Sequence, residues 1–216
     1  MPESKKHPLV SPFLIGINGP PGIGKSWLAK KLLTIVPAWT NPFSVKILGL
    51  RAIIWEEFKL TIRAEWDIES GDYEAMKSHI FADGMTGREK MIQHAEMRRA
   101  QDIHYWDRIF LEQMEADPPT ILIHDSMRMV EEQNFFLTHF KYMMVIVISP
   151  TRYSIGMQYD GDSGKCLPPT LGFRATSSDH ALQLFVELLN NVESQEHPKN
   201  GLDIWYRERV LGETVL

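Results

Sequence analysis

The residues with the clearest chemical potential form a glycine-rich segment near the N-terminus, Gly19-Pro20-Pro21-Gly22-Ile23-Gly24-Lys25-Ser26. Its spacing fits G-x-x-x-x-G-K-[ST], the pattern of a phosphate-binding loop, or P-loop. The glycines let the backbone turn with N–H groups directed inward, and the N-terminus of a following helix adds donors for a polyphosphate. The lysine can reach the β- and γ-phosphates of a nucleotide, and the serine hydroxyl can coordinate Mg²⁺. The segment therefore predicts a site for ATP and Mg²⁺.

We expect the nucleotide to be bound by this loop and the next residue, that is by Gly19, Gly22, Ile23, Gly24, Lys25, Ser26 and Trp27. Lys25 is also a catalytic candidate, and Ser26 is a candidate metal ligand. The apolar run 13–17 predicts a buried strand before the loop, and apolar residues at helical spacing predict a helix over 27–36, ended by Pro37. The alternative is an ordinary glycine-rich turn that caps a helix, which the order of strand, loop and helix disfavours.

An acidic residue at the end of another apolar run is the second candidate. Residues 120–124 predict a strand, and Asp125 follows it where open α/β sheets place their ligand-binding groups. A carboxylate there can hold Mg²⁺ or accept a hydrogen bond from a substrate hydroxyl, so Asp125 is a candidate metal ligand, catalytic residue and substrate-binding residue. The structural alternative is a cap on the next turn. Arg128 can fork a phosphate, as a catalytic and substrate-binding residue, or pair with Asp125 or Glu131.

Phosphoryl transfer also needs positive charge around the group that moves, and three more arginines lie at the ends of predicted elements. Arg51 follows the predicted strand 44–48, and Arg88 lies where a helix is predicted to begin, so both are candidates for binding the substrate. Arg152 follows the predicted strand 141–149 and is a catalytic candidate. Taken alone, each of these arginines is more often a charge on the solvated surface.

The rest of the chain alternates predicted strands with predicted helices. Residues 151–176 are rich in Gly, Ser, Asp and Pro and predict a loop or lid, which contains two further basic candidates, Lys165 and Arg174. Ser177-Ser178-Asp179 predicts the N-cap of a helix that runs to about Val192. The other helices are predicted over 51–66, 71–97 with a break near Gly84 and Gly87, 104–114 and 131–140. This alternation predicts a single α/β domain over residues 1–216 with a mainly parallel sheet.

Composition limits the function classes further. The chain has 216 residues, of which 44% are hydrophobic and 24% charged, as is typical of a globular protein. The formal net charge of −5 disfavours a protein whose main task is to coat DNA or RNA, so no nucleic-acid partner is expected. Cys166 is the only cysteine, which excludes an intrachain disulfide. No apolar run reaches the ~20 residues of a membrane span, and no signal peptide is recognisable, so we expect a cytoplasmic protein that does not associate with membranes.

At this point the sequence resembles a known family, the deoxynucleoside monophosphate kinases of tailed bacteriophages, which belong to the nucleoside monophosphate kinase group of P-loop proteins. The resemblance runs from about residue 12 to residue 193 and follows the order of four short segments beyond the P-loop. The first segment, 47–51, has Arg51 in place of a family lysine, and the second, 88–93, is later followed by Tyr105-Trp106. The third, 125–128, is followed by Glu131, and the fourth, 175–179, leads to Leu182. The chain departs from the family in the positions of Gln93 and Arg128 and in lacking its His-rich lid signature.

The resemblance implies a three-layer α/β/α P-loop NTPase fold with a mainly parallel sheet and a mobile lid at about 151–176. It implies an ATP-dependent deoxynucleoside monophosphate kinase, which transfers the γ-phosphoryl of ATP to a (deoxy)nucleoside monophosphate and gives the diphosphate. The acceptor would be neutralised by Arg51, Arg88 and Arg128. Arg152, with Lys165 or Arg174, would close over the phosphoryl group. A phage-encoded enzyme would work in the host cytoplasm, and a homodimer is compatible with the sequence.

Three other functions stay open. A P-loop kinase for another small molecule would share the nucleotide site, but an acceptor without a phosphate would not need several arginines. A nucleotide-dependent ATPase or switch acting on DNA or on a protein would share that site too, although the acidic balance counts against nucleic acid. A degenerate P-loop domain that binds nucleotide without chemistry is disfavoured by the intact Lys25 and Ser26.

Overall fold

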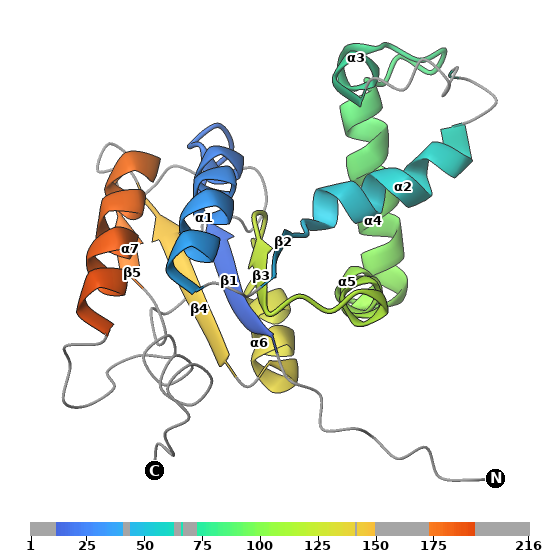
Figure 1. Ribbon diagram of the computed structural model, residues 1–216. Coiled ribbons are helices and arrows are strands. Elements are labelled where there is room, and N and C mark those ends of the chain that lie inside the picture. Colours follow the sequence, from blue (N-terminus) through green and yellow to red (C-terminus); the bar gives the residue numbers. More distant parts are fainter. Residues whose placement is uncertain are drawn as a thin grey trace, which may run out of the picture. The chain divides into compact units, whose positions relative to one another are not determined.

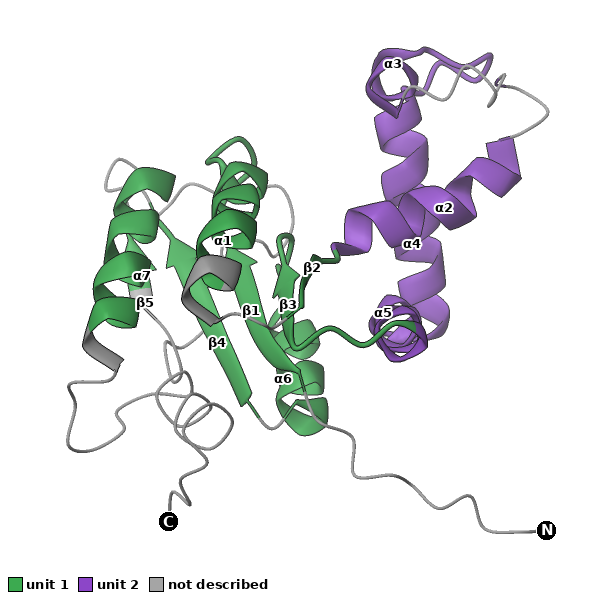
Figure 2. Ribbon diagram, in the orientation of Figure 1, with its two compact units in different colours: residues 1–48, 117–216 green, residues 49–116 purple. Residues whose placement is uncertain are grey.

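The computed structural model describes residues 12–40, 44–62, 66, 73–140, 142–149 and 173–192. The chain divides into two compact units (Figure 2). The first, called the sheet unit here, consists of residues 1–48 and 117–216, and the second, the helical unit, consists of residues 49–116. The helical unit is therefore inserted in the sequence between two strands of the sheet unit.

The described strands are parallel and form one sheet in the order β2-β3-β1-β4-β5 (Figure 1). Their bounds are β1 Phe13–Asn18, β2 Val45–Ile47, β3 Ile121–His124, β4 Tyr142–Ile148 and β5 Phe173–Ala175. β1, β3 and β4 are buried along their whole length, as expected for parallel strands covered by helices on both faces. In the register of β1, Gly16 lies opposite His124 and Asn18 lies opposite Val147. The carboxyl ends of β1 and β3 are therefore neighbours.

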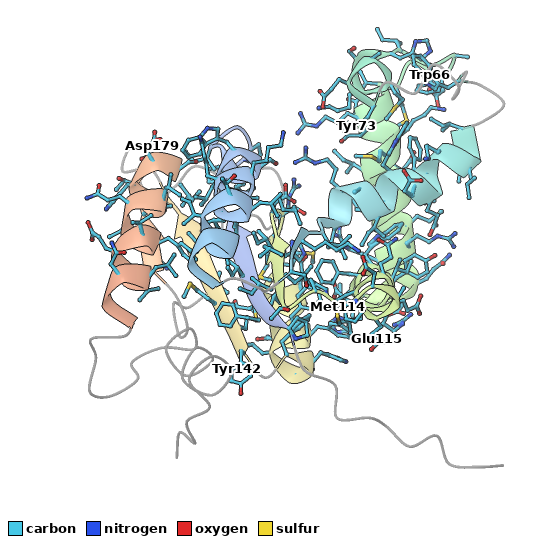
Figure 3. The ribbon with its side chains drawn as sticks, viewed as in Figure 1. Trp66, Tyr73, Met114, Glu115, Tyr142 and Asp179 are labelled. Atoms are coloured by element: carbon cyan, nitrogen blue, oxygen red, sulfur yellow. The ribbon has the colours of Figure 1, made fainter. Side chains whose placement is uncertain are left out.

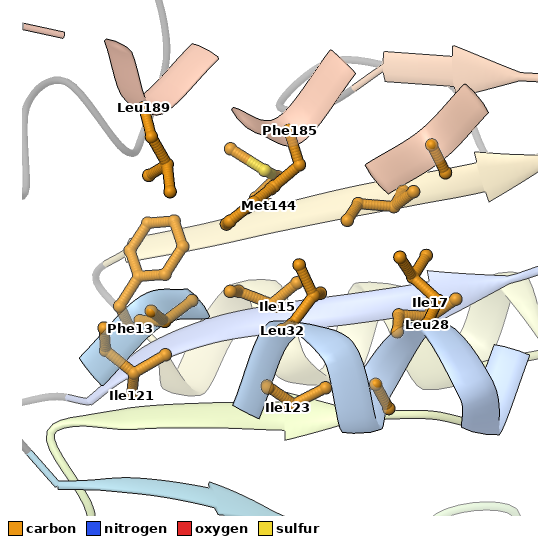
Figure 4. Close-up of a cluster of buried hydrophobic side chains, with 14 of the residues drawn as sticks. Phe13, Ile15, Ile17, Leu28, Leu32, Ile121, Ile123, Met144, Phe185 and Leu189 are labelled. Carbon is orange, nitrogen blue, oxygen red and sulfur yellow. The ribbon is translucent and has the colours of Figure 1, made fainter. Parts of the chain in front are cut away.

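Helices cover both faces of this sheet. α1 (Lys25–Thr40) and α7 (Ser178–Val192) pack on one face, and α6 (Val130–His139) covers the other, where Phe136 contacts the His124 ring. The core between the sheet, α1 and α7 includes Phe13, Ile15, Ile17, Leu28, Leu32, Ile121, Ile123, Met144, Phe185 and Leu189 (Figure 4). Each such side chain contributes about 1.5–3 kcal/mol through its burial. The sheet unit is thus a three-layer α/β/α sandwich with a mainly parallel sheet, which confirms the predicted P-loop fold class.

The end of α1 corrects one prediction from the sequence. The helix continues through Pro37 to Thr40, whereas the proline was expected to end it. A proline ring fixes φ at a value that suits a helix and removes one N–H donor. Here that loss is confined to the last turn, so the helix tolerates it.

The predicted loop or lid at 151–176 is corrected at its C-terminal end. Residues 173–175 form β5, which pairs with β4 and places Val147 opposite Arg174. A three-residue edge strand is held by backbone hydrogen bonds and is too short to show a side-chain period. Residues 150–172, with Arg152 and Lys165, lie outside the described residues, so the rest of the predicted lid stays a prediction.

The helical unit contains α2 (Leu50–Ile62), α3 (Tyr73–Ser78), α4 (Gly87–Gln101) and α5 (Tyr105–Ala116). The predicted break near Gly84 and Gly87 is the connection between α3 and α4, where Thr86 and Glu89 form a capping box. The described part of α2 ends at Ile62, and residues 63–65 of the predicted helix lie outside the described residues. In the part of the chain that the structure describes, no helix is long and apolar enough to cross a membrane.

Glu57 of α2 joins three helices of this unit. Its Oε1 accepts hydrogen bonds from His94 Nε2 at 3.0 Å and Arg98 Nε at 2.6 Å, and its Oε2 accepts one from the Tyr105 hydroxyl at 2.6 Å. Burial alone raises the pKa of Glu57, but hydrogen bonds from Tyr105, Arg98 and His94 and the charge of Arg98 lower that pKa overall. The ionised carboxylate is therefore a polar centre that holds α2, α4 and α5 together.

Candidate nucleotide-binding site

The P-loop predicted from the sequence connects β1 to α1. Gly19, Gly22 and Gly24 have positive φ angles of 152°, 76° and 92°. Residues with a Cβ are strained at such angles, so the path of the loop requires glycine at these positions. α1 begins at Lys25, so the N–H groups of its first turn, which have no acceptor within the helix, lie at the end of the loop. Backbone donors and a helix N-terminus meet here, which is the arrangement that binds phosphate.

The Lys25 side chain folds back onto the loop. It is 6% exposed, and its Nζ donates to the carbonyl oxygens of Gly19 at 2.6 Å and Pro20 at 2.8 Å. Carbonyl oxygens replace the water that the buried ammonium has lost. Phosphate oxygens can replace these carbonyls in turn, so the charge of Lys25 is already held at the loop that would receive a nucleotide.

The two predicted metal ligands are brought together by the sheet. The Ser26 hydroxyl, in the first turn of α1, donates to Asp125 Oδ2 at 2.8 Å. Both groups present oxygen, the ligand that Mg²⁺ prefers, and Mg²⁺ usually takes only one or two protein ligands beside water and phosphate. Among the described residues, no group of three or more His, Cys, Asp and Glu side chains gathers as a metal site. The pair therefore fits Mg²⁺ held jointly with a nucleotide better than a metal held by the protein alone.

A buried network supports the turn that follows β3 and carries Asp125. Nε2 of His124 and Oε1 of Glu132 are 2.9 Å apart, and the N–H of Ser126 donates to Nδ1 of His124 at 3.2 Å. Oε2 of Glu132 accepts from the N–H of Arg128 at 2.8 Å and from the N–H of Met129 at 3.2 Å. The turn is therefore tied both to the end of β3 and to the first turn of α6.

Sequence reasoning missed both side chains of this network. Burial alone raises the pKa of Glu132, but the hydrogen bond from His124 and two backbone donors lower it overall. The sequence offered Glu131 as the acid near Arg128, but Glu131 is exposed and the backbone of Arg128 bonds to Glu132. The available signal was a histidine that ends an apolar strand and an acid eight positions later, in a first helical turn.

The start of α7 lies against the P-loop, a contact that the sequence did not predict. Ser178 Oγ donates to the carbonyl oxygen of Ile23, and a Cβ added to Gly24 would lie 2.5 Å from that oxygen of Ser178. The predicted N-cap is confirmed, since Ser177 Oγ accepts from the N–H of His180 at 3.1 Å. Figure 3 labels Asp179 in this first turn. The loop thus receives support from α7 as well as from β1 and α1.

The predicted basic residues are distributed over both units. Arg128 is exposed on the turn after β3, and Arg174 is exposed on β5. Arg51 is half-buried in the first turn of α2, and Arg88 is exposed in the first turn of α4, so both belong to the helical unit. Arg152 lies outside the described residues.

Trp27, the last residue of the predicted nucleotide site, lies beside Ser26 in the first turn of α1. Its side chain is 40% exposed, and Nζ of Lys31 lies 5.7 Å from the centre of its ring. This contact is a cation–π interaction on the same helix. Trp27 is therefore a partly exposed aromatic group next to the loop.

Comparisons with known proteins identify no family. No protein-family model matches the sequence, and no curated protein matches it. A crystal structure of shikimate kinase from Bacteroides thetaiotaomicron matches over 93% of this chain and 99% of its own, with 12% identity and a TM-score of 0.31. A TM-score of this size carries no conclusion about fold or activity. The P-loop fold class rests instead on the strand order, the loop between β1 and α1, and the Ser26–Asp125 pair.

Proposed function

We propose that the chain is a P-loop kinase that transfers the γ-phosphoryl group of ATP to the phosphate of a (deoxy)nucleoside monophosphate. The observation that carries this proposal is the hydrogen bond between Ser26 and Asp125, beside a loop that already holds the ammonium of Lys25. The ammonium of Lys25 and the oxygens of Ser26 and Asp125 lie at one edge of the sheet, which supports a site for phosphate and Mg²⁺. The sequence resemblance to the phage kinases supports the choice of acceptor.

The nucleotide half of the site follows from the P-loop. The backbone N–H groups of the loop and Lys25 would bind the phosphates of ATP, with Lys25 exchanging the carbonyls of Gly19 and Pro20 for phosphate oxygens. Ser26 and Asp125 would hold Mg²⁺, which neutralises negative charge on the phosphates when bound. Trp27 would lie beside the nucleotide without a role in the chemistry.

The acceptor half of the proposed site depends on arginines. The sequence resemblance assigns this role to Arg51, Arg88 and Arg128. An arginine can bind two phosphate oxygens at once, so residues of this type suit an acceptor that carries a phosphate. Arg152, with Lys165 or Arg174, is proposed to enclose the moving group.

The reaction needs no covalent enzyme intermediate. A phosphate oxygen of the acceptor is already a nucleophile, so positioning and charge neutralisation account for most of the catalysis. Asp125 is proposed to act through its metal, while Lys25 and Arg128 would stabilise the negative charge that moves with the phosphoryl group. Closure over the site would exclude water and so prevent hydrolysis of ATP.

An ADP-release assay with ATP, Mg²⁺ and a panel of nucleoside monophosphates tests this proposal. We expect turnover that requires one of these acceptors, and we expect Lys25→Ala to lower it at least ~100-fold. Lys30→Ala is the matched control, because Lys30 is exposed on the same helix, and it should leave turnover unchanged. ATP binding without monophosphate-dependent turnover would contradict the proposal, and turnover stimulated by DNA or by acceptors without phosphate would favour the other functions.

A further inference from the structure

Two buried polar side chains support the turn that carries Asp125: His124 directly precedes Asp125, and Glu132 lies in the first turn of α6. His124 is 0% exposed and Glu132 is 4% exposed. Removing a carboxylate from water costs several kcal/mol unless partners compensate, and apolar side chains at both positions would avoid that cost. We infer that His124 and Glu132 are positioning residues for the metal site, which fix the backbone around Asp125 so that its carboxylate faces Ser26. This inference rests on the proposed function, which gives Asp125 its role toward Mg²⁺.

The backbone determines the direction of each hydrogen bond in the network. The N–H of Ser126 can only donate, so Nδ1 of His124 is the acceptor and the ring proton is on Nε2. Nε2 then donates to Oε1 of Glu132. Oε2 of Glu132 accepts from the N–H groups of Arg128 and Met129. Glu132 must therefore accept hydrogen bonds on both of its oxygens at the same time, which a carboxylate can do and an amide cannot.

β1 holds the same turn from another side. Nδ2 of Asn18 donates to the carbonyl oxygen of Met127 at 3.0 Å. The side chain of Met127 is fully buried over Gly16, where an added Cβ would lie 2.7 Å from Met127 Cε. Backbone groups after Asp125 are thus tied to β1, β3 and α6. Asp125 itself has little backbone freedom left, and its Oδ2 lies 2.8 Å from Ser26 Oγ.

Glu132→Gln removes the second accepting oxygen of Glu132 with almost no change in side-chain volume. If the amide oxygen faces the N–H groups of Arg128 and Met129, the amide NH₂ meets the N–H of His124. If the oxygen faces His124, the NH₂ meets the two backbone donors instead. Either orientation opposes donor to donor, so one side of the turn is released. The expected consequence is a displaced Asp125 carboxylate, while the P-loop and Lys25 are left in place.

The affinity for ATP, measured by titration calorimetry in EDTA and in Mg²⁺, tests the inference on the full chain. We expect Mg²⁺ to raise the ATP affinity of the wild type and Glu132→Gln to lose about tenfold of that increase, the effect typical of groups that orient metal ligands. The affinity in EDTA should be unchanged. In turnover assays, the Mg²⁺ concentration at half-maximal rate should rise by about the same factor.

Phe185→Leu is the control for a general loss of stability, because Phe185 is buried on the other face of the sheet, and both of its affinities should match the wild type. His124→Phe removes the acceptor of the Ser126 N–H and should act in the same direction, so it decides the question if Glu132→Gln does not fold. A wild-type response to Mg²⁺ in the folded variants would overturn the inference, as would an equal loss of affinity in EDTA. The binding measurement needs no acceptor. If turnover does not depend on a monophosphate, the proposed function is overturned, but the comparison of ATP affinities still tests this inference.

Discussion

The hydroxyl of Ser26 donates to Oδ2 of Asp125 at 2.8 Å, although the two residues are 99 positions apart in the sequence. The parallel pairing of β1 with β3 explains this proximity, because it places the turn after β3 beside the start of α1. The pair is part of one polar edge, together with the folded-back Lys25 and the glycines of the P-loop. These groups support the proposal that this edge of the sheet binds phosphate and Mg²⁺.

Asp125→Asn should separate metal chemistry from folding. The amide oxygen can still accept the hydroxyl of Ser26, so the melting temperature should stay within a few degrees of the wild type. The loss of a charged metal ligand should lower kcat/KM by about 10²-fold or more, since a bound metal is worth several kcal/mol in the transition state. Thermal unfolding and steady-state kinetics on the same preparation check both expectations. Undiminished turnover would remove Asp125 from the metal site.

Gly24→Ala should destabilise the protein more than Gly22→Ala. Both positions have a positive φ, which costs an alanine roughly 1–2 kcal/mol. A Cβ at Gly24 would also lie 2.5 Å from Ser178 Oγ, whereas a Cβ at Gly22 would meet nothing within 4 Å. Urea unfolding of the two variants measures the difference. Adding Ser178→Ala to Gly24→Ala should recover part of the loss, and additive effects of these two substitutions would contradict the contact.

Arg51→Ala and Arg88→Ala should weaken the binding of the acceptor and leave the binding of ATP unchanged. Each is expected to raise the KM for the nucleoside monophosphate about tenfold, the value of one charge-assisted hydrogen bond, with the KM for ATP unchanged. Arg99→Ala is the control, because Arg99 lies in the last turn of α4, at the other end from Arg88. Kinetics with each substrate varied in turn will distinguish the two KM values. Unchanged acceptor KM values in both variants would point to an acceptor without a phosphate.

Glu57→Gln should make the stability of the protein less dependent on pH. The pKa of Glu57 is lowered in the folded state, so its contribution is fully present above the usual glutamate value of about 4.3 and disappears as pH falls through the lowered value. The variant should be about 1–3 kcal/mol less stable than the wild type at pH 6, because the three donors lose a charged acceptor.

Urea unfolding at pH 6 and at pH 3 measures this difference, which should shrink at the lower pH. Glu56→Gln provides the control at the neighbouring position, where an exposed carboxylate pairs with Lys59 and should contribute less than ~1 kcal/mol. An equal gap between Glu57→Gln and the wild type at both pH values would contradict the role of the ionised carboxylate.

β1, β2, β3, β4 and the P-loop could be predicted because their signals are local. β4 is an apolar run bounded by polar residues, and the loop has the glycine, lysine and serine spacing that is typical of a P-loop. Ser26 and Asp125 could be placed together because parallel strands bring their carboxyl ends to one edge. Because these signals come from local sequence and from strand direction, the predictions did not require knowledge of which side chains pack against one another.

The supporting residues could not be predicted, because their roles arise only from packing. Glu131 and Glu132 are adjacent acids in one helical turn, and the sequence does not distinguish the exposed one from the buried one. The contact between Ser178 and the P-loop joins residues 155 positions apart, and no spacing rule relates them. The helical unit was also not predicted, because no linker marks either of its borders in the sequence and its compactness arises only from packing.

Transfer of labelled phosphate from γ-labelled ATP tests the central claim most directly. The wild-type protein is incubated with Mg²⁺ and the preferred nucleoside monophosphate, and the products are separated, with Lys25→Ala in parallel. The account predicts that the label appears in the nucleoside diphosphate and that Lys25→Ala lowers its transfer at least ~100-fold. Label found only in inorganic phosphate, or label transfer that is independent of the monophosphate, would contradict it.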